Sequence, residues 1–456
     1  MPNCKSAVNS SHKFFTYFVI FCAGLGGILY GYDIGVISGA LLFVQKTIPM
    51  SDSQTGFIVG AVLTGGLLGT LITGPLADRF GRKKTIIAAC VIFVIGILLI
   101  LVSYDFITLL AARLLLGIGV GVIAVAVPLY LTEVVPAHLR GRGVTIFQLF
   151  LTFGIVLAYF IDLLFTASGN WRGMFAVILI PVAVLFLGML LLPETPRWLL
   201  SKKKDQEAKQ VLLKTLPESE VAGEYLQIQE SLKITESGWK TLFARCFWLP
   251  LFVSLMIAAC NQLTGINVLL QYAPLVIKNT GLVSNESSMF GTVGIGLVNF
   301  FATILSFFLI DFFGRRRLLI IGTAGIIVAY VYLGCLPFFV QVGKLQAELA
   351  LAGFFAFIAF YAVGPGVVVW LAISELLPTK VRGKAVSLGL FVNSLAASVL
   401  STVFLSIQNG LGISGTYFLF AGFTLIYFLV AFFLLPETKG KTLEEIQLFY
   451  QRKKIA

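Results

Sequence analysis

Long apolar segments recur along almost the whole chain. Twelve such segments can be placed, centred near residues 30, 65, 95, 121, 153, 182, 262, 301, 328, 361, 396 and 424. A helix needs about twenty apolar residues to cross a bilayer, and each of these segments is long enough. Because 58% of the 456 residues are hydrophobic and only 12% are charged, the sequence predicts an all-α membrane protein with twelve transmembrane helices.

Basic residues are concentrated in every second connection between these segments. Cytoplasmic loops of membrane proteins are enriched in lysine and arginine, so we expect a multi-pass protein with both termini in the cytoplasm. The net charge of +12 is therefore a topology signal, and no nucleic-acid partner is predicted. The first segment carries Asp33 and lacks a small-residue cleavage site, so it is expected to be a retained helix and not a signal peptide. The basic residues are Arg79, Arg82, Lys83, Lys84, Arg140, Arg142, Lys202, Lys203, Lys204, Arg315, Arg316, Arg317, Lys380, Arg382 and Lys384.

The two halves of the chain carry the same motifs in the same order. "TEVVPAHLRGRG" after the fourth segment matches "SELLPTKVRGKA" after the tenth, and "GPLADRFGRKK" after the second matches "IDFFGRRRL" after the eighth. "PETPR" and "PETKG" close the sixth and twelfth segments. Duplicated halves around a shared central site are common in secondary transporters. We expect an N-terminal bundle over residues 1–193, a cytoplasmic linker with short helices over 194–245, a C-terminal bundle over 246–436 and a cytoplasmic tail over 437–456.

The seventh segment, "CNQLTGINVLLQYAP", holds more polar side chains than a transmembrane helix tolerates. On an unbroken helix Gln262 and Asn267 would point about 140° apart. Both can face one ligand only if the helix bends, and Gly265 and Pro274 permit such a bend. Amides both donate and accept hydrogen bonds without carrying charge. The segment therefore predicts a site for a neutral ligand rich in hydroxyl groups, at the depth where transporters bind substrates.

An aspartate in the middle of the first segment also needs an explanation. Glycine recurs every four residues near Asp33, at Gly31, Gly35 and Gly39. This spacing predicts close packing against a neighbouring helix. A carboxylate inside a membrane needs a partner, and the fourth segment offers an intramembrane cation, Arg113. Protonation of Asp33 would release Arg113, which would let a proton control which conformation is stable. The alternative is a permanent structural ion pair.

Metal sites and enzyme active sites are not predicted. The six cysteines have no metal-ligand spacing, and most lie in apolar segments, where they are expected to pack. The two histidines, His12 and His138, lie on the cytoplasmic side, and no nucleophile with an adjacent base can be identified. We therefore expect a protein that is not an enzyme, with no cofactor and no metal.

The ordered set of motifs, with "QLTGIN" and the "GPG" before Trp370, resembles the sugar porter family of the major facilitator superfamily over nearly the whole chain. The resemblance implies two pseudo-symmetric six-helix bundles, a small cytoplasmic helical domain, and transport of a hexose, pentose or polyol. It also implies a coupling role for Asp33 and Arg113, since these positions match the pair of proton-coupled members. A monomer in a bacterial inner membrane, with a sugar, protons and lipid as partners, is expected.

Two further groups of residues have candidate roles, the first implied by the resemblance and the second indicated by the charges of the duplicated motifs. For the first group, the polar residues that would contact the substrate, the alternative is hydrogen bonding between helices. For the second group, the charged residues at helix ends, the alternative is that they set the membrane topology and pair only incidentally. The implied substrate contacts are Gln148, Gln262, Asn267, Asn299 and Trp370, with Asn261, Gln271 and Asn393 beside them. The charged residues that can pair across helix ends and hold the bundles shut at the cytoplasmic gate are Asp78, Arg79, Arg82, Glu133, Arg140, Glu194, Asp311, Arg315, Glu375, Arg382 and Glu437.

Several departures from the family pattern leave the substrate open. Asn261 replaces a glutamine, Gln271 replaces a tyrosine, and Ala362 and Ser394 stand where many members have a glutamate and a tryptophan. A larger and more polar pocket would favour a polyol such as inositol over glucose. A facilitative sugar uniporter is the main alternative to a proton symporter. A sugar sensor and a drug or metabolite exporter are weaker alternatives, since only a short tail follows Lys441 and the amide set suits a polyol.

Overall fold

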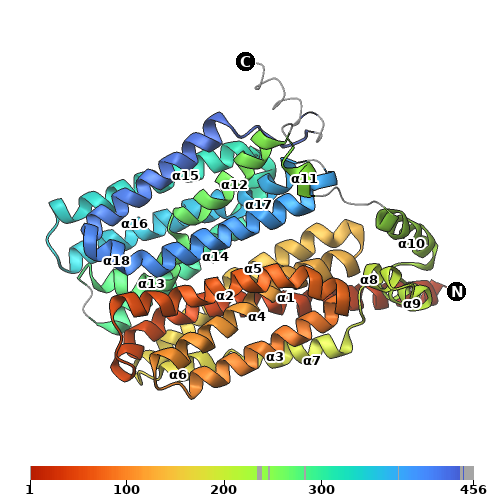
Figure 1. The fold of residues 1–456 in the computed structure, drawn as a ribbon, viewed down its shortest axis with the longest axis horizontal. Coiled ribbons are helices and arrows are strands. Elements are labelled where there is room, and N and C mark those ends of the chain that lie inside the picture. The colour runs from red at the N-terminus through yellow and green to blue at the C-terminus, as the bar shows by residue number, and fades with distance from the viewer. Residues whose placement is uncertain are drawn as a thin grey trace.

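The computed structural model describes residues 2–233, 239–244, 247–281, 284–377, 379–441 and 445, which form helices and short connections without a strand. Two helical bundles lie side by side, one above the other in Figure 1. The N-terminal bundle consists of α1 (Pro2–Thr47), α2 (Asp52–Phe80), α3 (Arg82–Leu101), α4 (Phe106–Val134), α5 (Ala137–Thr166), α6 (Trp171–Ala176) and α7 (Leu179–Leu191). The C-terminal bundle consists of α12 (Trp248–Leu263), α13 (Ile266–Lys278), α14 (Asn285–Phe313), α15 (Arg315–Phe339), α16 (Lys344–Val363), α17 (Pro365–Glu375) and α18 (Thr379–Phe433).

The expected twelve transmembrane helices are confirmed. Eleven spans in the described part of the chain are long and apolar enough to cross a membrane. The last one, Gly383–Phe433, has 51 residues, about 77 Å of helix, which is more than twice the thickness of a bilayer core. Gly412 within it has a φ of 70° and is not helical. This helix therefore contains two crossings.

Two other transmembrane segments are interrupted by glycine. Between α12 and α13, Gly265 adopts the left-handed conformation with a φ of 82°, which favours glycine. Between α16 and α17, the chain passes through Gly364 and restarts at Pro365, and proline is well suited to the first turn of a helix. The predicted bend between Gln262 and Asn267 is therefore confirmed.

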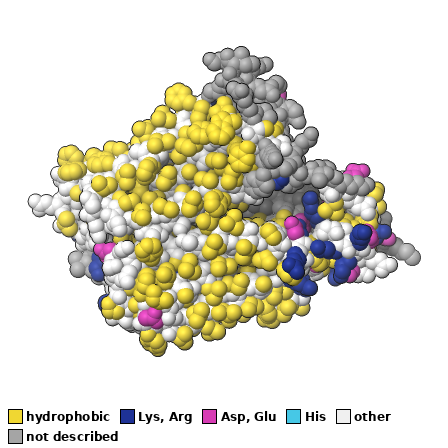
Figure 2. Space-filling view, in the orientation of Figure 1, with side chains coloured by type: hydrophobic (Ala, Val, Ile, Leu, Met, Phe, Trp, Pro, Cys, Tyr) yellow, Lys and Arg dark blue, Asp and Glu magenta, His cyan; other side chains and the backbone are white. Residues whose placement is uncertain are grey.

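Three short helices lie outside the bundles. They are α8 (Pro196–Ser201), α9 (Asp205–Thr215) and α10 (Glu218–Lys233), followed by α11 (Trp239–Leu242) at the C-terminal bundle. Helices α8–α10 lie beside the N-terminus (Figure 1), and their apolar residues form small clusters of their own. In Figure 2, hydrophobic side chains cover the sides of both bundles, while lysines and arginines gather at this end. The positive-inside rule makes this end the cytoplasmic one.

The glycine stripe of α1 packs directly against α5, as the spacing predicts. A Cβ atom on Gly31 would lie 1.8 Å from the carbonyl oxygen of Leu151, and one on Gly35 would lie 2.7 Å from the Cβ atom of Ala158. Both distances are shorter than any real contact. Small residues therefore allow the two helix backbones to approach closely, and α1 is held rigidly within its bundle.

The two bundles meet mainly in their outer halves. Helix α2 packs on α18, α5 on α14 and α1 on α13. Three hydrogen bonds between described residues cross this interface, and all lie on the outer side. They are Thr64 Oγ1 with Ser398 Oγ at 2.6 Å, Asn409 Nδ2 to Asp52 Oδ2 at 2.8 Å and Tyr159 Oη to the Leu270 carbonyl at 2.6 Å. The structure is therefore closed on its outer side.

Candidate functional site

Asp33 and Arg113 form an ion pair in the core of the N-terminal bundle. Arg113 Nη1 on α4 donates to Asp33 Oδ1 on α1 at 3.0 Å, and the two side chains are 0% and 1% exposed. The guanidinium also lies 5.4 Å from the centre of the Phe175 ring. Asp33 Oδ2 and the Nε and Nη2 atoms of Arg113 have no hydrogen-bond partner in the described structure. A single hydrogen bond thus joins two fully buried charges, an arrangement that adds little net stability.

The break in the seventh segment brings its two predicted amides together. Asn267 Nδ2 on α13 donates to Gln262 Oε1 on α12 at 2.8 Å, and Gln262 Nε2 donates to Asn393 Oδ1 on α18 at 3.2 Å. Gln262 and Asn393 are each 8% exposed. Three neutral amides from three helices therefore form one chain of hydrogen bonds, in which Gln262 is the central residue.

The other predicted substrate contacts do not join this chain of amides. Gln148 and Trp370 are half-buried, and Asn299 is buried. No hydrogen bond between described residues links the side chains of these three to the chain. Gln271 is fully buried, and neither its Oε1 nor its Nε2 atom has a hydrogen-bond partner in the described structure. Gln271 follows Asn267 by one helical turn, so both side chains lie on one face of α13.

Asn261 has a different partner, which sequence reasoning missed. Its Oδ1 atom accepts a hydrogen bond from the Tyr361 hydroxyl at 3.3 Å. Tyr361 lies just before the break between α16 and α17. This tyrosine adjoins Ala362, which departs from the family pattern, and that departure was the signal in the sequence.

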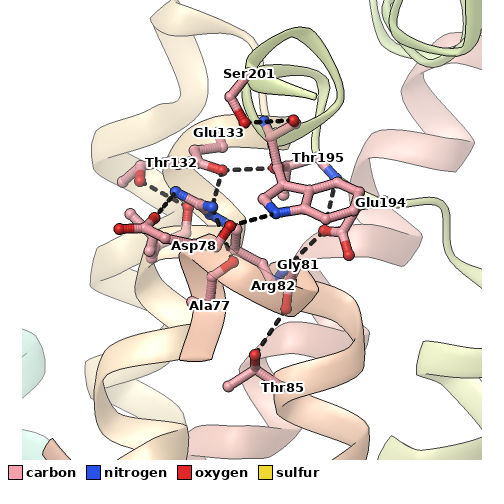
Figure 3. Close-up of polar contacts among 12 residues, drawn as sticks. Ala77, Asp78, Gly81, Arg82, Thr85, Thr132, Glu133, Glu194, Thr195 and Ser201 are labelled. Carbon is pink, nitrogen blue, oxygen red and sulfur yellow. Dashed lines mark hydrogen bonds and ion pairs between the residues drawn. The ribbon is translucent and has the colours of Figure 1, made fainter. Parts of the chain in front are cut away.

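At the cytoplasmic end of the N-terminal bundle, Arg82 is the centre of a charged cluster (Figure 3). Its Nη2 atom lies 3.1 Å from Asp78 Oδ1, and its Nε atom lies 3.0 Å from Glu133 Oε2. Glu194 accepts hydrogen bonds from the backbone N–H groups of Arg82 and Lys83 at 3.0 and 3.1 Å. These groups begin α3, and helix N-termini attract negative charge. A carboxylate therefore fixes the start of α3.

The C-terminal bundle repeats the arginine–glutamate pair of this cluster and the glutamate at the start of the next helix. Arg315 Nη2 lies 3.2 Å from Glu375 Oε1, as Arg82 pairs with Glu133. Glu437 accepts from the backbone N–H groups of Arg315 and Arg316 at the start of α15, at 2.9 and 3.2 Å. A hydroxyl completes each cluster, because Thr195 donates to Glu133 and Thr438 donates to Glu375. The internal repeat in the sequence therefore corresponds to a repeat in the structure.

The expected gate, in which these charges hold the two bundles shut on the cytoplasmic side, stays a prediction. The predicted charges do pair across helix ends, but every ion pair and hydrogen bond given above lies within one bundle and not between bundles. Because the structure is closed on the outer side, the inner ends are not held together by these groups. The side chains of Arg140, Asp311 and Arg382 and the residue Pro378 lie outside the described residues.

A second buried aspartate was also missed by sequence reasoning. Asp162 on α5 is 0% exposed, and its Oδ2 atom accepts a hydrogen bond from the backbone N–H group of Gly39 at 3.0 Å. Its Oδ1 atom has no partner, and no described lysine or arginine forms an ion pair with it. A lone aspartate in the apolar stretch "AYFIDLLF" carries the same signal as Asp33.

Comparison with known proteins gives consistent matches over nearly the whole chain. The model of the "Sugar (and other) transporter" family matches residues 19–450. The galactose-proton symporter of Escherichia coli (strain K12) is 34% identical over 98% of this chain and 97% of the symporter. The arabinose-proton symporter of the same strain is 35% identical over 94% of this chain and 92% of its own. The D-xylose transporter of Levilactobacillus brevis is 35% identical over 95% and 96%, respectively.

Solved structures agree with these matches. The inward-open conformation of the xylose transporter XylE from Escherichia coli superposes with a TM-score of 0.83 at 28% identity, and covers 95% of this chain and 99% of XylE. The proton:xylose symporter XylE bound to 6-bromo-6-deoxy-D-glucose superposes with a TM-score of 0.78 at 28% identity, and covers 96% and 100%. The higher score of the inward-open form fits a structure whose bundles are joined on the outer side.

Proposed function

Because this chain belongs to the sugar transporter family, whose members are transporters and not enzymes, we propose that it carries a monosaccharide or polyol across the membrane together with protons. The relatives named above include proton symporters of galactose and arabinose. The observation that carries the proposal is the buried ion pair between Asp33 and Arg113. The desolvation of two charges offsets their attraction, so such a pair adds little stability, and its place deep in a bundle points to a function.

Protonation of Asp33 couples the proton to the conformational change. The neutral acid no longer attracts Arg113, so the free energy of any state that depends on the pair changes when the proton binds. Once Asp33 is neutral, the attraction between opposite charges is gone, and only the single hydrogen bond holds the two side chains together. When the proton leaves on the cytoplasmic side, the pair forms again and the cycle restarts.

The substrate binds to the amides of the C-terminal bundle. In the structure Gln262 and its neighbours bond to each other, and sugar hydroxyls can replace these bonds because they also both donate and accept. Gln271 offers a buried amide without a partner on the face of α13 that carries Asn267. Gln148, Asn299 and Trp370 contribute from neighbouring helices. The extra amide at position 271 favours a polyol with many hydroxyl groups.

The charged clusters position helix ends at the cytoplasmic gate. They keep the starts of α3 and α15 fixed within each bundle, so that each bundle moves as a rigid body. The two bundles correspond to residues 1–193 and 246–436, joined by the linker 194–245. We place the protein in a bacterial inner membrane, as a monomer.

Transport in proteoliposomes tests this function. Sugar added to one side of purified, reconstituted protein should make the medium alkaline as protons enter with the substrate. A panel of labelled hexoses, pentoses and inositol would identify the substrate. Uptake of a sugar without a change in external pH would favour the facilitative uniporter.

A further inference from the structure

Pro274 leaves one backbone carbonyl of α13 without its helical partner. In an α-helix the carbonyl of residue 270 would accept from the N–H group of residue 274, and proline has none. The Tyr159 hydroxyl on α5 donates to the Leu270 carbonyl instead, at 2.6 Å. Tyr159 and Leu270 are 0% and 4% exposed. A side chain of one bundle thus satisfies a backbone group of the other, in a place that water does not reach.

This hydrogen bond contacts the segment that carries the proposed substrate amides. Leu270 lies between Asn267 and Gln271, beyond the break at Gly265. The bond is therefore made to the outer half of the broken helix. When the bundles separate on the outside, the hydroxyl moves away from the carbonyl, and water must take its place.

We propose that Tyr159 is a gating residue that holds α13 in the position in which the outer side is closed. A hydrogen bond made in one conformation and lost in another biases the equilibrium toward the first. The role rests on the proposed alternation between outward-open and inward-open states, but it does not depend on which sugar is carried or on coupling to protons.

Tyr159→Phe tests the proposal by removing only the hydroxyl group. The readout is the distance between spin labels at Tyr104 and Val342, which lie on outer loops of opposite bundles and are 79% and 74% exposed. The labels are introduced as cysteines into a variant without native cysteines, in detergent or nanodiscs without sugar. One lost hydrogen bond should increase the ratio of outward-open to outward-closed molecules about fivefold.

Tyr330→Phe is the matched control. Its hydroxyl also donates to a backbone carbonyl of the broken helix, that of Thr264, but Tyr330 lies on α15 in the same bundle. A purely structural role would lower the melting temperature of both variants and leave the label distances unchanged. We expect the outer distance to increase in Tyr159→Phe alone. An equal change in both variants, or no change in either, would overturn the proposal.

Pro274→Ala provides a second test, because alanine restores an N–H group that can bond the Leu270 carbonyl within the helix. In this background the loss of the Tyr159 hydroxyl should shift the outer distance much less. An undiminished shift would show that the Leu270 carbonyl is not the group through which Tyr159 acts. These measurements need no transport, so failure of the symport function would leave their outcome unaffected.

Discussion

Gly56 of α2 lies where the outer ends of the two bundles pack closely against each other. A Cβ atom at this position would lie 2.1 Å from the backbone oxygen of Thr402 on α18, whereas ordinary contact begins at 3.4 Å. The backbone atom cannot rotate away, so in Gly56→Ala the helices must separate by 3.4 − 2.1 = 1.3 Å. The hydrogen bond of 2.6 Å between Thr64 and Ser398, about two turns further along α2, would be stretched by the same movement.

The steric cost of the added methyl group falls only on the outward-closed conformation. Overpacking of this kind costs about 1–3 kcal/mol, and it disappears once α2 and α18 separate on the outside. A shift of about 2 kcal/mol changes a population ratio roughly thirtyfold. Gly56→Ala should therefore convert a largely outward-closed protein into one with a substantial outward-open fraction, without unfolding either bundle.

The distance between spin labels at Tyr104 and Val342 measures this change. Gly74→Ala is the control, because Gly74 lies on the same helix and a Cβ atom there would meet nothing within 4 Å. The Gly56→Ala distribution should gain a longer component that the control lacks. Identical distributions in the two variants would refute the idea that the contact of α2 with α18 closes the outer side.

Three further predictions concern the buried polar groups. Gln262→Ala should weaken sugar binding measured by calorimetry by about 1–3 kcal/mol, and more than Asn299→Ala does, because only Gln262 is the centre of the amide chain. Equal losses of affinity in the two variants would show that Gln262 is not the main contact. Asp162→Asn should retain concentrative sugar uptake, because the amide keeps an acceptor oxygen for the α1 backbone and no counter-charge is lost; abolished uptake would assign Asp162 a role in coupling. Arg82→Gln should lower the melting temperature more than Arg315→Gln, because a broken ion pair costs more when it is buried. The side chains of Arg82 and Glu133 are 9% and 6% exposed, whereas those of Arg315 and Glu375 are 17% and 27% exposed. A larger decrease of the melting temperature in Arg315→Gln would contradict this prediction.

The sequence predicted those features that depend on local spacing. Helical periodicity required a bend between Gln262 and Asn267, and Gly265 forms it. The four-residue glycine stripe predicted a close helix contact, although its partner, α5, could not be identified from spacing alone. Duplicated motifs predicted duplicated clusters, and Glu194 and Glu437 indeed bind the starts of α3 and α15 in the same way.

Features that depend on distant parts of the chain were not predictable in this way. Local motifs do not say whether Arg82 pairs within its bundle or across to the other, because both arrangements place opposite charges at helix ends. The bond from Tyr159 to Leu270 joins residues 111 positions apart, and only the missing N–H group of Pro274 indicated that a partner was needed. Asp162 was predictable, since its signal equals that of Asp33.

Transport by Asp33→Asn tests proton coupling through Asp33. The asparagine mimics the protonated acid permanently, so the pH gradient can no longer drive the cycle, while the amides that bind the substrate are unchanged. In proteoliposomes we expect that accumulation against a sugar gradient is lost and that counterflow down a sugar gradient persists. Accumulation by Asp33→Asn at the level of the unchanged protein would contradict proton coupling through Asp33.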